Sequence, residues 1–351
     1  MILKVCLCLA SLGVVLRAAS AQERWPYYEP GVGTQGETKY LDHHAPRPSV
    51  LGSSKGESVI ICSDLGRYVM CVGPDNATSW IYNSAPEWGP QHIARVGSDI
   101  VAPIGDEIVL ISFKTGQRTT GFKPRPGRRI NFAVPVVGAY LIGFESEKDP
   151  AGRQLQGGQV ILWNEEEGET WGLQAATVSP RSGLLHGDLV IIAETFAQKV
   201  FAVSRSTGKV RWTIESIYPS QLQLLKSGKL LIVEEHANRI VQLDLKSLNK
   251  EVLFSANHPL FRDTNLTWSQ LKRGENETID PLSSVKGLSL AAMESSGRYT
   301  LYSPNGVHVF RDSLYIADTD NHRVVQLSDR KIITRELTSV FNPTGVLVMP
   351  P

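Results

Sequence analysis

A short motif recurs along the second half of this chain, and the interval between its copies restricts the fold. Residues 179–205 align without a gap onto residues 303–329, an offset of 124 residues. A third copy, residues 230–243, places Arg239 forty residues after Lys199, so that three steps of about 41 residues span the offset. A repeat of this length, made of short β-rich runs, is typical of the blades of a β-propeller.

Each repeat predicts the second, third and fourth strands of one antiparallel blade. In one repeat these strands are 188–194, 199–203 and 210–214, and in the next they are 230–234, 239–244 and 251–254. The same frame gives five blades between about residues 91 and 338. A sixth, from residues 59–82, lacks its inner strand, and residues 343–350 form a strand without a blade. Joining the two removes exposed sheet edges. The sequence therefore predicts an all-β, six-bladed propeller of four-stranded blades, closed by an N- and C-terminal clasp.

The ends of the chain differ in composition from the repeats. Lys4, the apolar run 5–16 and the small residues 19–21 have the features of a signal peptide, so residues 1–21 are expected to be removed on export. Residues 22–56 are rich in Pro, Gly and His and predict an extended lead-in. Residues 57–351 form the single propeller domain, with insertions predicted near 148–157 and 257–302.

Sequons and cysteines bear on the cellular route of the chain. The three Asn-X-Thr sequons, at Asn76, Asn265 and Asn276, beside a signal peptide predict a secreted glycoprotein. After removal of residues 1–21, the remaining cysteines are Cys62 and Cys71. An even pair in an oxidising compartment favours a disulfide bond, with two buried thiols as the alternative.

The charge balance limits the partners that this chain can have. The formal net charge is +1, which argues against a nucleic-acid partner, since nucleic acids require a basic surface. No run after the signal peptide reaches the length of a membrane span. We therefore expect a monomer whose partner is a small-molecule substrate.

Propellers bind ligands at one mouth of the central channel, where the inner strands start and where strands two and three are joined. Polar residues at the predicted inner-strand starts, which are candidates for substrate binding, are His92, Asn131, Gln221, Asn305 and Asn342. The loops between strands two and three carry further polar residues, among them Asp64, Glu235, His236, Asp320 and His322.

His236 and His322 are the candidate catalytic residues of this mouth, because imidazole can act as a general base near neutral pH. The alternative is that both histidines belong to the structure of their loops. Glu194, Glu234 and Asp318 recur at one position of successive blades, which favours a structural role. The basic column Lys199, Arg239 and Arg323 is interpreted in the same way.

Three local sequences resemble known propeller families. The first resembles the SMP-30/gluconolactonase-like propellers, and consists of Ser-Pro-Asn-Gly-Val at 303–307 followed by Leu-Tyr-Ile-Ala-Asp at 314–318. Residues 317–324 resemble an NHL repeat, and the turn at 206–212 resembles quinoprotein-type repeats. Each resemblance covers blades rather than the whole chain.

The SMP-30 resemblance implies a divalent cation, Ca²⁺ or Mg²⁺, in the central channel, with the amide oxygen of Asn305 as a ligand. It also implies carboxylate ligands at inner-strand starts, and none occupies a matching position. No cofactor is therefore certain from the sequence, and Asn305 can instead cap its Pro-Asn-Gly turn.

A signal-bearing, glycosylated chain of this kind is similar to secreted fungal propellers of natural-product pathways, a group that includes hetero-Diels–Alderases. This resemblance implies a cyclase of secondary metabolism that positions its reactants in a shaped pocket. The chain has no Gly-X-Ser-X-Gly, His-Glu-X-X-His or phosphate-loop motif, which excludes serine hydrolases, zincins and kinases of those types. The alternatives are a metal-dependent lactonase of the SMP-30 type and a non-catalytic ligand-binding propeller.

Overall fold

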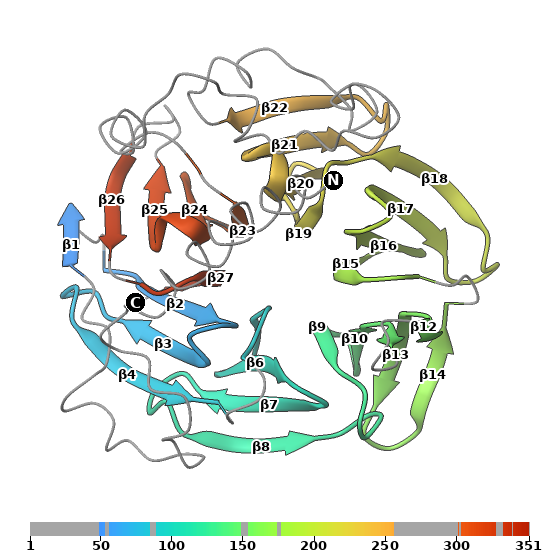
Figure 1. The fold of residues 1–351 in the computed structure, drawn as a ribbon, viewed down its shortest axis with the longest axis horizontal. Helices are drawn as coiled ribbons and strands as arrows, with labels where there is room; N and C mark the ends of the chain where they lie inside the picture. Colours follow the sequence, from blue (N-terminus) through green and yellow to red (C-terminus); the bar gives the residue numbers. More distant parts are fainter. Residues whose placement is uncertain are drawn as a thin grey trace, which may run out of the picture.

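Six antiparallel blades surround a central channel (Figure 1). The structure, a computed structural model, describes residues 49–52, 56–84, 89–148, 154–173, 177–255, 301, 303–327, 333–338 and 340–350. This arrangement confirms the predicted fold class and the five blades that the repeat located between residues 91 and 338.

We number the blades in chain order and give their strands from the channel outwards. Blade 1 contains β27 (Pro343–Met349), β2 (Ser58–Ser63), β3 (Tyr68–Val72) and β4 (Thr78–Asn83). Blade 2 contains β5 (Ala94–Val96), β6 (Asp99–Ile104), β7 (Glu107–Ser112) and β8 (Arg118–Phe122). Blade 3 contains β9 (Ile130–Val136), β10 (Ala139–Phe144), β13 (Gln159–Asn164) and β14 (Gly168–Gly172).

The remaining blades follow the same order. Blade 4 contains β15 (Pro180–His186), β16 (Leu189–Glu194), β17 (Lys199–Ser204) and β18 (Val210–Glu215). Blade 5 contains β19 (Pro219–Leu224), β20 (Lys229–Glu234), β21 (Arg239–Asp244) and β22 (Lys250–Ser255). Blade 6 contains β23 (Pro304–Phe310), β24 (Ser313–Asp318), β25 (Arg323–Leu327) and β26 (Ile333–Thr338).

The two middle strands of a blade are apolar because neighbouring blades cover both of their faces. β2 and β3 are buried at every position, whereas the outer strand β18 is buried at none. Between blades 3 and 4 the core is centred on Phe132, which is fully buried. Its ring lies against Gly143 and Gly183, where a Cβ atom would approach ring atoms to 2.0 and 2.7 Å respectively. Gly143, which pairs with Phe132 inside blade 3, therefore leaves room for the ring, and Gly183 allows the close approach of blade 4.

Strands from both ends of the chain complete the first and last blades. β27 pairs with β2 along its whole length, from Met349 opposite Ser58 to Pro343 opposite Ser63, and forms the inner strand of blade 1 (Figure 1). β1 (Ser49–Gly52), from the predicted lead-in, pairs with β26 as a fifth, outermost strand of blade 6. The lead-in prediction did not anticipate this strand.

Acid–base pairs fix the loops between the second and third strands. Arg239 Nε donates to Glu234 Oε2, and Arg323 Nε lies 2.7 Å from Asp318 Oδ2, with all four side chains almost completely buried. The same carboxylate of Glu234 also accepts the Ile217 backbone N–H, 3.2 Å away, just before the inner strand of its blade. These contacts agree with the structural role predicted for the recurring acids Glu234 and Asp318 and for the basic residues Arg239 and Arg323.

Other predicted features of the chain fall partly outside the described residues. The insertion near 148–157 contains a two-stranded hairpin, β11 (Glu147–Lys148) with β12 (Gln154–Gln156). Residues 1–21 and almost all of 257–302, with the sequons at Asn265 and Asn276, lie outside the described residues. Asn76 lies in the β3–β4 turn, where its amide oxygen accepts a hydrogen bond of 2.5 Å from buried Arg335 of blade 6. Over the described ranges, the helical segments are too short or too polar to cross a bilayer.

The structure corrects the expected disulfide bond, because Cys62 and Cys71 are free, buried thiols. Both side chains face the core between blades 1 and 2, but Cys62 lies opposite Val69 and Cys71 lies opposite Ile60. The two cysteines are therefore diagonal neighbours across the strand pair, and Cα atoms in this relation are roughly 7–8 Å apart, too far for a disulfide without movement of the backbone.

We expect both thiols to be unreactive in the native protein. Burial raises the pKa of Cys62 to about 12 and that of Cys71 to about 11, so neither forms the reactive thiolate at pH 8. A chain that lacks residues 1–21 should show no thiols reacting with Ellman's reagent when native and two when denatured without reductant. Two thiols that appear only after reduction would contradict this.

Removal of β27 should prevent cooperative folding. Deletion of residues 343–351 exposes the inner edge of β2 and removes Val346, Leu347, Val348 and Met349 from two hydrophobic clusters. A matched deletion of residues 350–351, which lie beyond the strand, should leave the thermal midpoint unchanged. Circular dichroism melting of both variants measures the difference, and a normal cooperative transition for the longer deletion would refute the dependence on β27.

Candidate functional site

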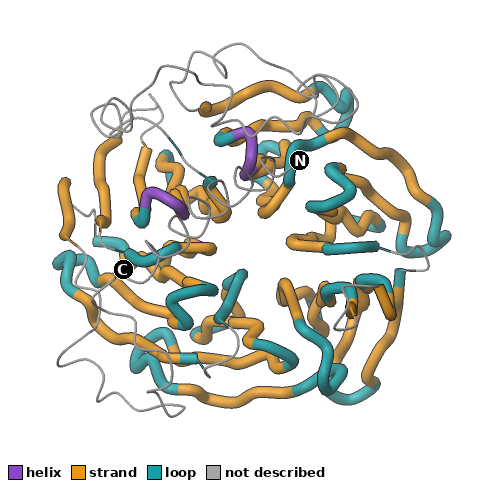
Figure 2. Tube along the Cα trace, in the orientation of Figure 1, coloured by secondary structure: helices purple, strands orange, loops and turns teal. Residues whose placement is uncertain are grey.

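A polar cavity of about 340 Å³ lies at one mouth of the channel. Two 3₁₀ helices, η3 (Glu235–Ala237) and η4 (Thr319–Asn321), are drawn in purple in Figure 2. Each contributes two residues to the wall of the cavity. Every described residue that lines this cavity has a polar side chain, and these are Asp64, Gln91, His92, Arg181, Ser220, Gln221, Glu235, His236, Ser303, Asn305, Thr319, Asp320, Asn342 and Thr344. The cavity is built by five of the six blades, so that its shape depends on the closed ring.

A β-bulge at the start of the inner strands directs polar side chains toward the channel. In blade 4, Pro180 pairs with Glu194 and Ser182 pairs with Ala193, which leaves Arg181 without a partner in the ladder. The same irregularity leaves Asn305 in blade 6 and Thr344 in blade 1 without a partner in the ladder. In blade 5 it leaves both Ser220 and Gln221 without one. A bulge re-aims the extra residue. This repeated bulge explains why successive blades present a polar side chain to one cavity.

The residue before the inner strand adopts left-handed backbone geometry in three blades. These residues are Tyr218, Ser303 and Asn342, with φ angles of 46°, 52° and 44°, and each precedes a proline. Left-handed geometry is unfavourable for residues with a Cβ, and a following proline restricts the backbone toward extended geometry. Ser303 and Asn342 line the cavity. The chain therefore maintains a strained backbone at the edge of the site.

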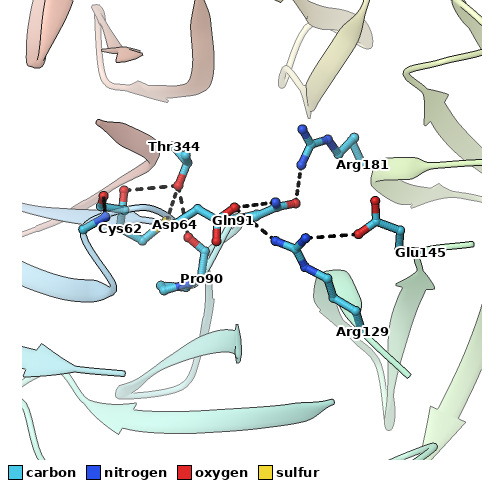
Figure 3. Close-up of polar contacts among 10 residues, drawn as sticks. Cys62, Asp64, Pro90, Gln91, Arg129, Glu145, Arg181 and Thr344 are labelled. Atoms are coloured by element: carbon cyan, nitrogen blue, oxygen red, sulfur yellow. Dashed lines mark hydrogen bonds and ion pairs between the residues drawn. The ribbon is translucent and has the colours of Figure 1, made fainter. Parts of the chain in front are cut away.

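One side of the cavity is a network of charged and amide groups (Figure 3). Asp64 Oδ2 accepts hydrogen bonds from Gln91 Nε2 at 2.6 Å and from Arg129 Nη2 at 3.0 Å. Gln91 Oε1 in turn accepts a hydrogen bond from Arg181 Nη1, and Arg129 Nη1 lies 3.2 Å from Glu145 Oε2. Arg129 thus compensates the charge of Asp64, and the same chain of contacts holds the guanidinium of Arg181 at the cavity wall.

Two further carboxyl groups of the wall, those of Glu235 and Asp320, have only partial charge compensation. Burial raises the pKa of Glu235, an effect that Arg181 and contacts with Ser303 and Asn305 offset only in part. Burial and the neighbouring Glu235 raise the pKa of Asp320. The Ser303 hydroxyl lies 3.1 Å from Glu235 Oε1 and donates to it. These two acids therefore take up protons more readily than ordinary surface carboxylates.

Two histidines complete the wall. Burial lowers the pKa of His92 to about 4, and its buried Nδ1 atom has no hydrogen-bond partner among the described residues. Burial also lowers the pKa of His236, whose Nε2 lies 4.0 Å from Glu235 Oε1. The His236 ring stacks on Tyr218 with centroids 3.7 Å apart. Both imidazoles are neutral at pH 7, and His236 beside Glu235 can accept a proton.

The structure brings together five of the seven predicted binding and catalytic residues, namely His92, Gln221, His236, Asn305 and Asn342. Asn131 and His322 are outside the cavity. Asn131 is buried and donates to the carbonyl of Pro180, 3.1 Å away, and so connects blades 3 and 4. His322 stacks on Phe341, and its Nδ1 accepts the Asn342 backbone N–H at 3.1 Å. Its position supports Asn342 rather than a bound ligand.

Ser220, Ser303 and Thr344 are cavity residues that sequence reasoning missed. Each is adjacent to a proline that begins an inner strand, Pro219, Pro304 or Pro343, and this repeated position is the signal that could have identified them. Within the part of the chain that is described, no group of three or more His, Cys, Asp or Glu residues could hold a metal ion. The amide nitrogen of Asn305, the expected ligand residue, donates to Thr319 Oγ1 at 3.3 Å.

Glu234 and Glu235 are adjacent acids of blade 5, and neutralising them one at a time should change the free energy of unfolding in opposite directions. Burial opposes ionisation of Glu234, but Arg239 and Lys250 outweigh it and lower its pKa. Its stabilising contribution is present above pH 4.5 and is lost as the pH falls through the lowered folded-state pKa. The raised pKa of Glu235 has the reverse effect: stability is greatest below pH 4.5 and declines as the pH rises through the folded-state pKa.

At pH 7, Glu234→Gln should therefore lower the free energy of unfolding by about 3 kcal/mol, since it leaves Arg239 buried without its partner. Glu235→Gln should raise it, because a poorly compensated charge is removed. Urea unfolding at pH 7 measures both changes. Equal destabilisation by the two substitutions would show that Glu235 is part of the scaffold like Glu234.

Comparisons with known proteins agree with this architecture. A chain from a protein of unknown function from Bacteroides caccae is similar to this one with a TM-score of 0.59 and 11% identity, over 85% of this chain and 100% of that one. A chain of the nidogen/laminin complex gives a TM-score of 0.54 and 12% identity, over 84% and 98%. At this identity the likeness concerns the fold alone. No curated protein matches the sequence.

Residues 156–346 match the PQQ_2 family model, described as outer membrane protein assembly factor BamB. This region covers more than half of the chain and extends from the end of β12 in blade 3 to the middle of β27. It includes the turn at 206–212, where the sequence resembles quinoprotein-type repeats. On this match, the chain belongs to the PQQ_2, BamB-like family of β-propeller proteins.

Proposed function

We propose that this protein is a secreted enzyme that binds a small, polar organic molecule in the cavity at the channel mouth and catalyses proton transfer. The observation that carries the proposal is the cavity wall, whose described residues bring carboxyl, amide, hydroxyl, guanidinium and imidazole groups together and include no apolar side chain. Buried polar groups require hydrogen-bonding partners, so the bound molecule must itself supply many polar atoms.

The reacting groups are Glu235, His236 and Asp320. The pKa of Glu235 is raised and that of His236 is lowered, so their proton affinities move toward one another. General acid–base catalysis is most effective when the pKa of the catalytic group is near the working pH. We assign His236 as the base and protonated Glu235 or Asp320 as the acid, with Arg181 and Asn305 orienting the substrate.

With these reacting groups, a lactone-opening enzyme is favoured over the cyclase that the sequence resemblance implied first. A hetero-Diels–Alderase-like cyclase of apolar natural products would require apolar walls around its reactants, and this polar wall is unfavourable for them. Hydrolytic opening of a hydroxylated lactone is a better match to a polar cavity with an acid and a base. The base takes a proton from the water that forms the new bond to the acyl carbon, and the acid gives a proton to the ring oxygen that leaves it. The cation of the SMP-30-type lactonase has less support, because its expected carboxylate cage is missing from the described residues.

The secretory route is part of the same proposal. It is supported by the signal-like segment 1–21 and by the sequons. The description of the matched family names an outer membrane protein assembly factor. No feature of this cavity favours that role over a small ligand, and a non-catalytic binding propeller is therefore an outcome of the following test.

Calorimetry with hydroxylated lactones, aldonic acids, sugars and apolar dienes should detect binding of a hydroxylated compound and no binding of the dienes. Asp320→Asn should weaken that binding roughly tenfold, as expected when a hydrogen-bonding carboxyl group of the wall is lost. Glu166→Gln, in the exposed β13–β14 turn, is the matched control and should bind normally. NMR of the same mixtures should show turnover that is lost in Glu235→Gln.

Three results would contradict the proposal. Binding restricted to the dienes would favour the cyclase, and binding abolished by EDTA would favour the metal-dependent lactonase. Binding of a hydroxylated compound without turnover of any candidate would indicate a non-catalytic binding protein.

A further inference from the structure

An aromatic column extends from the wall of the cavity along its rim. His236 lines the cavity and stacks on Tyr218 with ring centroids 3.7 Å apart and an interplanar angle of 17°. Phe196 meets Tyr218 edge-on, with centroids 6.2 Å apart and an angle of 90°. We call Phe196, Tyr218 and His236 the rim column.

Phe196 occupies the blade position of two cavity residues. It follows Glu194 by two residues in the β16–β17 loop, as His236 follows Glu234 in blade 5 and Asp320 follows Asp318 in blade 6. His236 and Asp320 line the cavity, whereas Phe196 lies outside it with 52% of its surface exposed. The loop that carries Phe196 is anchored, because the buried Thr195 hydroxyl lies 2.7 Å from the Pro219 carbonyl and donates to it.

The exposed ring contributes little to the core of the blade. Apolar residues of strands β16 and β17 form the buried clusters of blade 4, and Phe196 belongs to none of them. Tyr218, which the Phe196 ring contacts edge-on, has the left-handed backbone described above, with φ 46°. Such strain in a bulky residue marks a position where the surrounding structure enforces a particular orientation. The rim column thus presents an ordered aromatic surface next to a polar cavity.

A sugar matches both parts of this surface. A hydroxyl group donates one hydrogen bond and accepts others, and the cavity offers acceptors on Glu235 and Asp320 beside donors on Arg181. The C–H face of a sugar ring is apolar and slightly positive, so it packs on the negative face of an aromatic ring. The cavity, at about 340 Å³, is at the lower end of the range of roughly 300–1,000 Å³ for ligand sites. It can accommodate one ring, while a second ring would lie outside, on the rim.

We propose that the ligand is a saccharide of at least two rings, with one ring in the cavity and the next on Phe196. This inference rests on the proposed function, because it names the substrate class of the same cavity. The first ring makes hydrogen bonds with Glu235, Asp320 and Arg181. The second ring stacks on Phe196, which determines how the saccharide chain leaves the site.

The test measures binding of glucose, mannose and N-acetylglucosamine, and of their β1,4- and α-linked disaccharides and trisaccharides, by calorimetry. For a saccharide that binds, Phe196→Ala should weaken affinity for the di- or trisaccharide roughly three- to tenfold, the effect of losing one stacked ring, and leave the monosaccharide unchanged. Phe196→Trp should retain the longer ligand. Val210→Ala, on outer strand β18 and similarly exposed at 53%, is the control and should bind like the wild type.

Three outcomes would overturn the inference. If the lactones or aldonic acids of the preceding test bind but no di- or trisaccharide does, the saccharide assignment fails while the proposed function stands. If Phe196→Ala weakens mono- and oligosaccharides equally, or weakens neither, the rim subsite is wrong although the cavity binds sugar. If no small molecule binds at all, the proposed function fails together with this inference. Melting temperatures equal to that of the wild type would confirm that the variants are folded.

Discussion

The pairing of β27 with β2 is the interaction on which the rest of the molecule depends. Each blade of a propeller buries its middle strands because a neighbouring blade lies on both sides, so the ring must close for the first and last blades to be covered as well. Closure here uses the last strand of the chain as the inner strand of the first blade. The same contact completes the cavity, because Thr344 of β27 and Asn342, just before it, face the channel beside Asp64 of blade 1. Fold stability and site geometry therefore depend on one junction between the chain ends.

The blades repeat a single backbone design and vary the side chains at a few of its positions. The bulge at the start of the inner strands and the loop between strands two and three recur around the ring, and they place Arg181, Ser220, Asn305 and Thr344 at equivalent points. The scaffold supplies the positions, and the residue at each position supplies the chemistry. Asn131 shows the limit of this design, since it occupies the same bulge in blade 3 but uses its amide to bind the backbone of blade 4.

Glu234 and Glu235 show how neighbouring residues acquire different roles. Glu234 ends a strand and is neutralised by Arg239 and Lys250 in a buried pair, as the equivalent Asp318 is by Arg323. Glu235 begins the following 3₁₀ turn, faces the cavity and has a raised pKa. A fold gains nothing from a second, poorly compensated acid such as Asp320 beside it, so the pair is better explained by a ligand than by stability.

The sequence by itself determined the number of blades and, to within one residue, the bounds of the strands predicted for blades 4 and 5, because the repeat period of about 41 residues and the β-rich runs are local properties of the chain. The third strand of blade 5, Arg239–Asp244, was predicted to the residue. Only the tertiary structure decided which side chains meet. The register of β2 against β3 separates Cys62 from Cys71, and a local stacking contact turns His322 toward Phe341 while His236 lines the cavity. Register and bulges depend on contacts between strands that are distant in sequence, and a shift of one residue reverses the face of every side chain, so periodicity alone could not assign them.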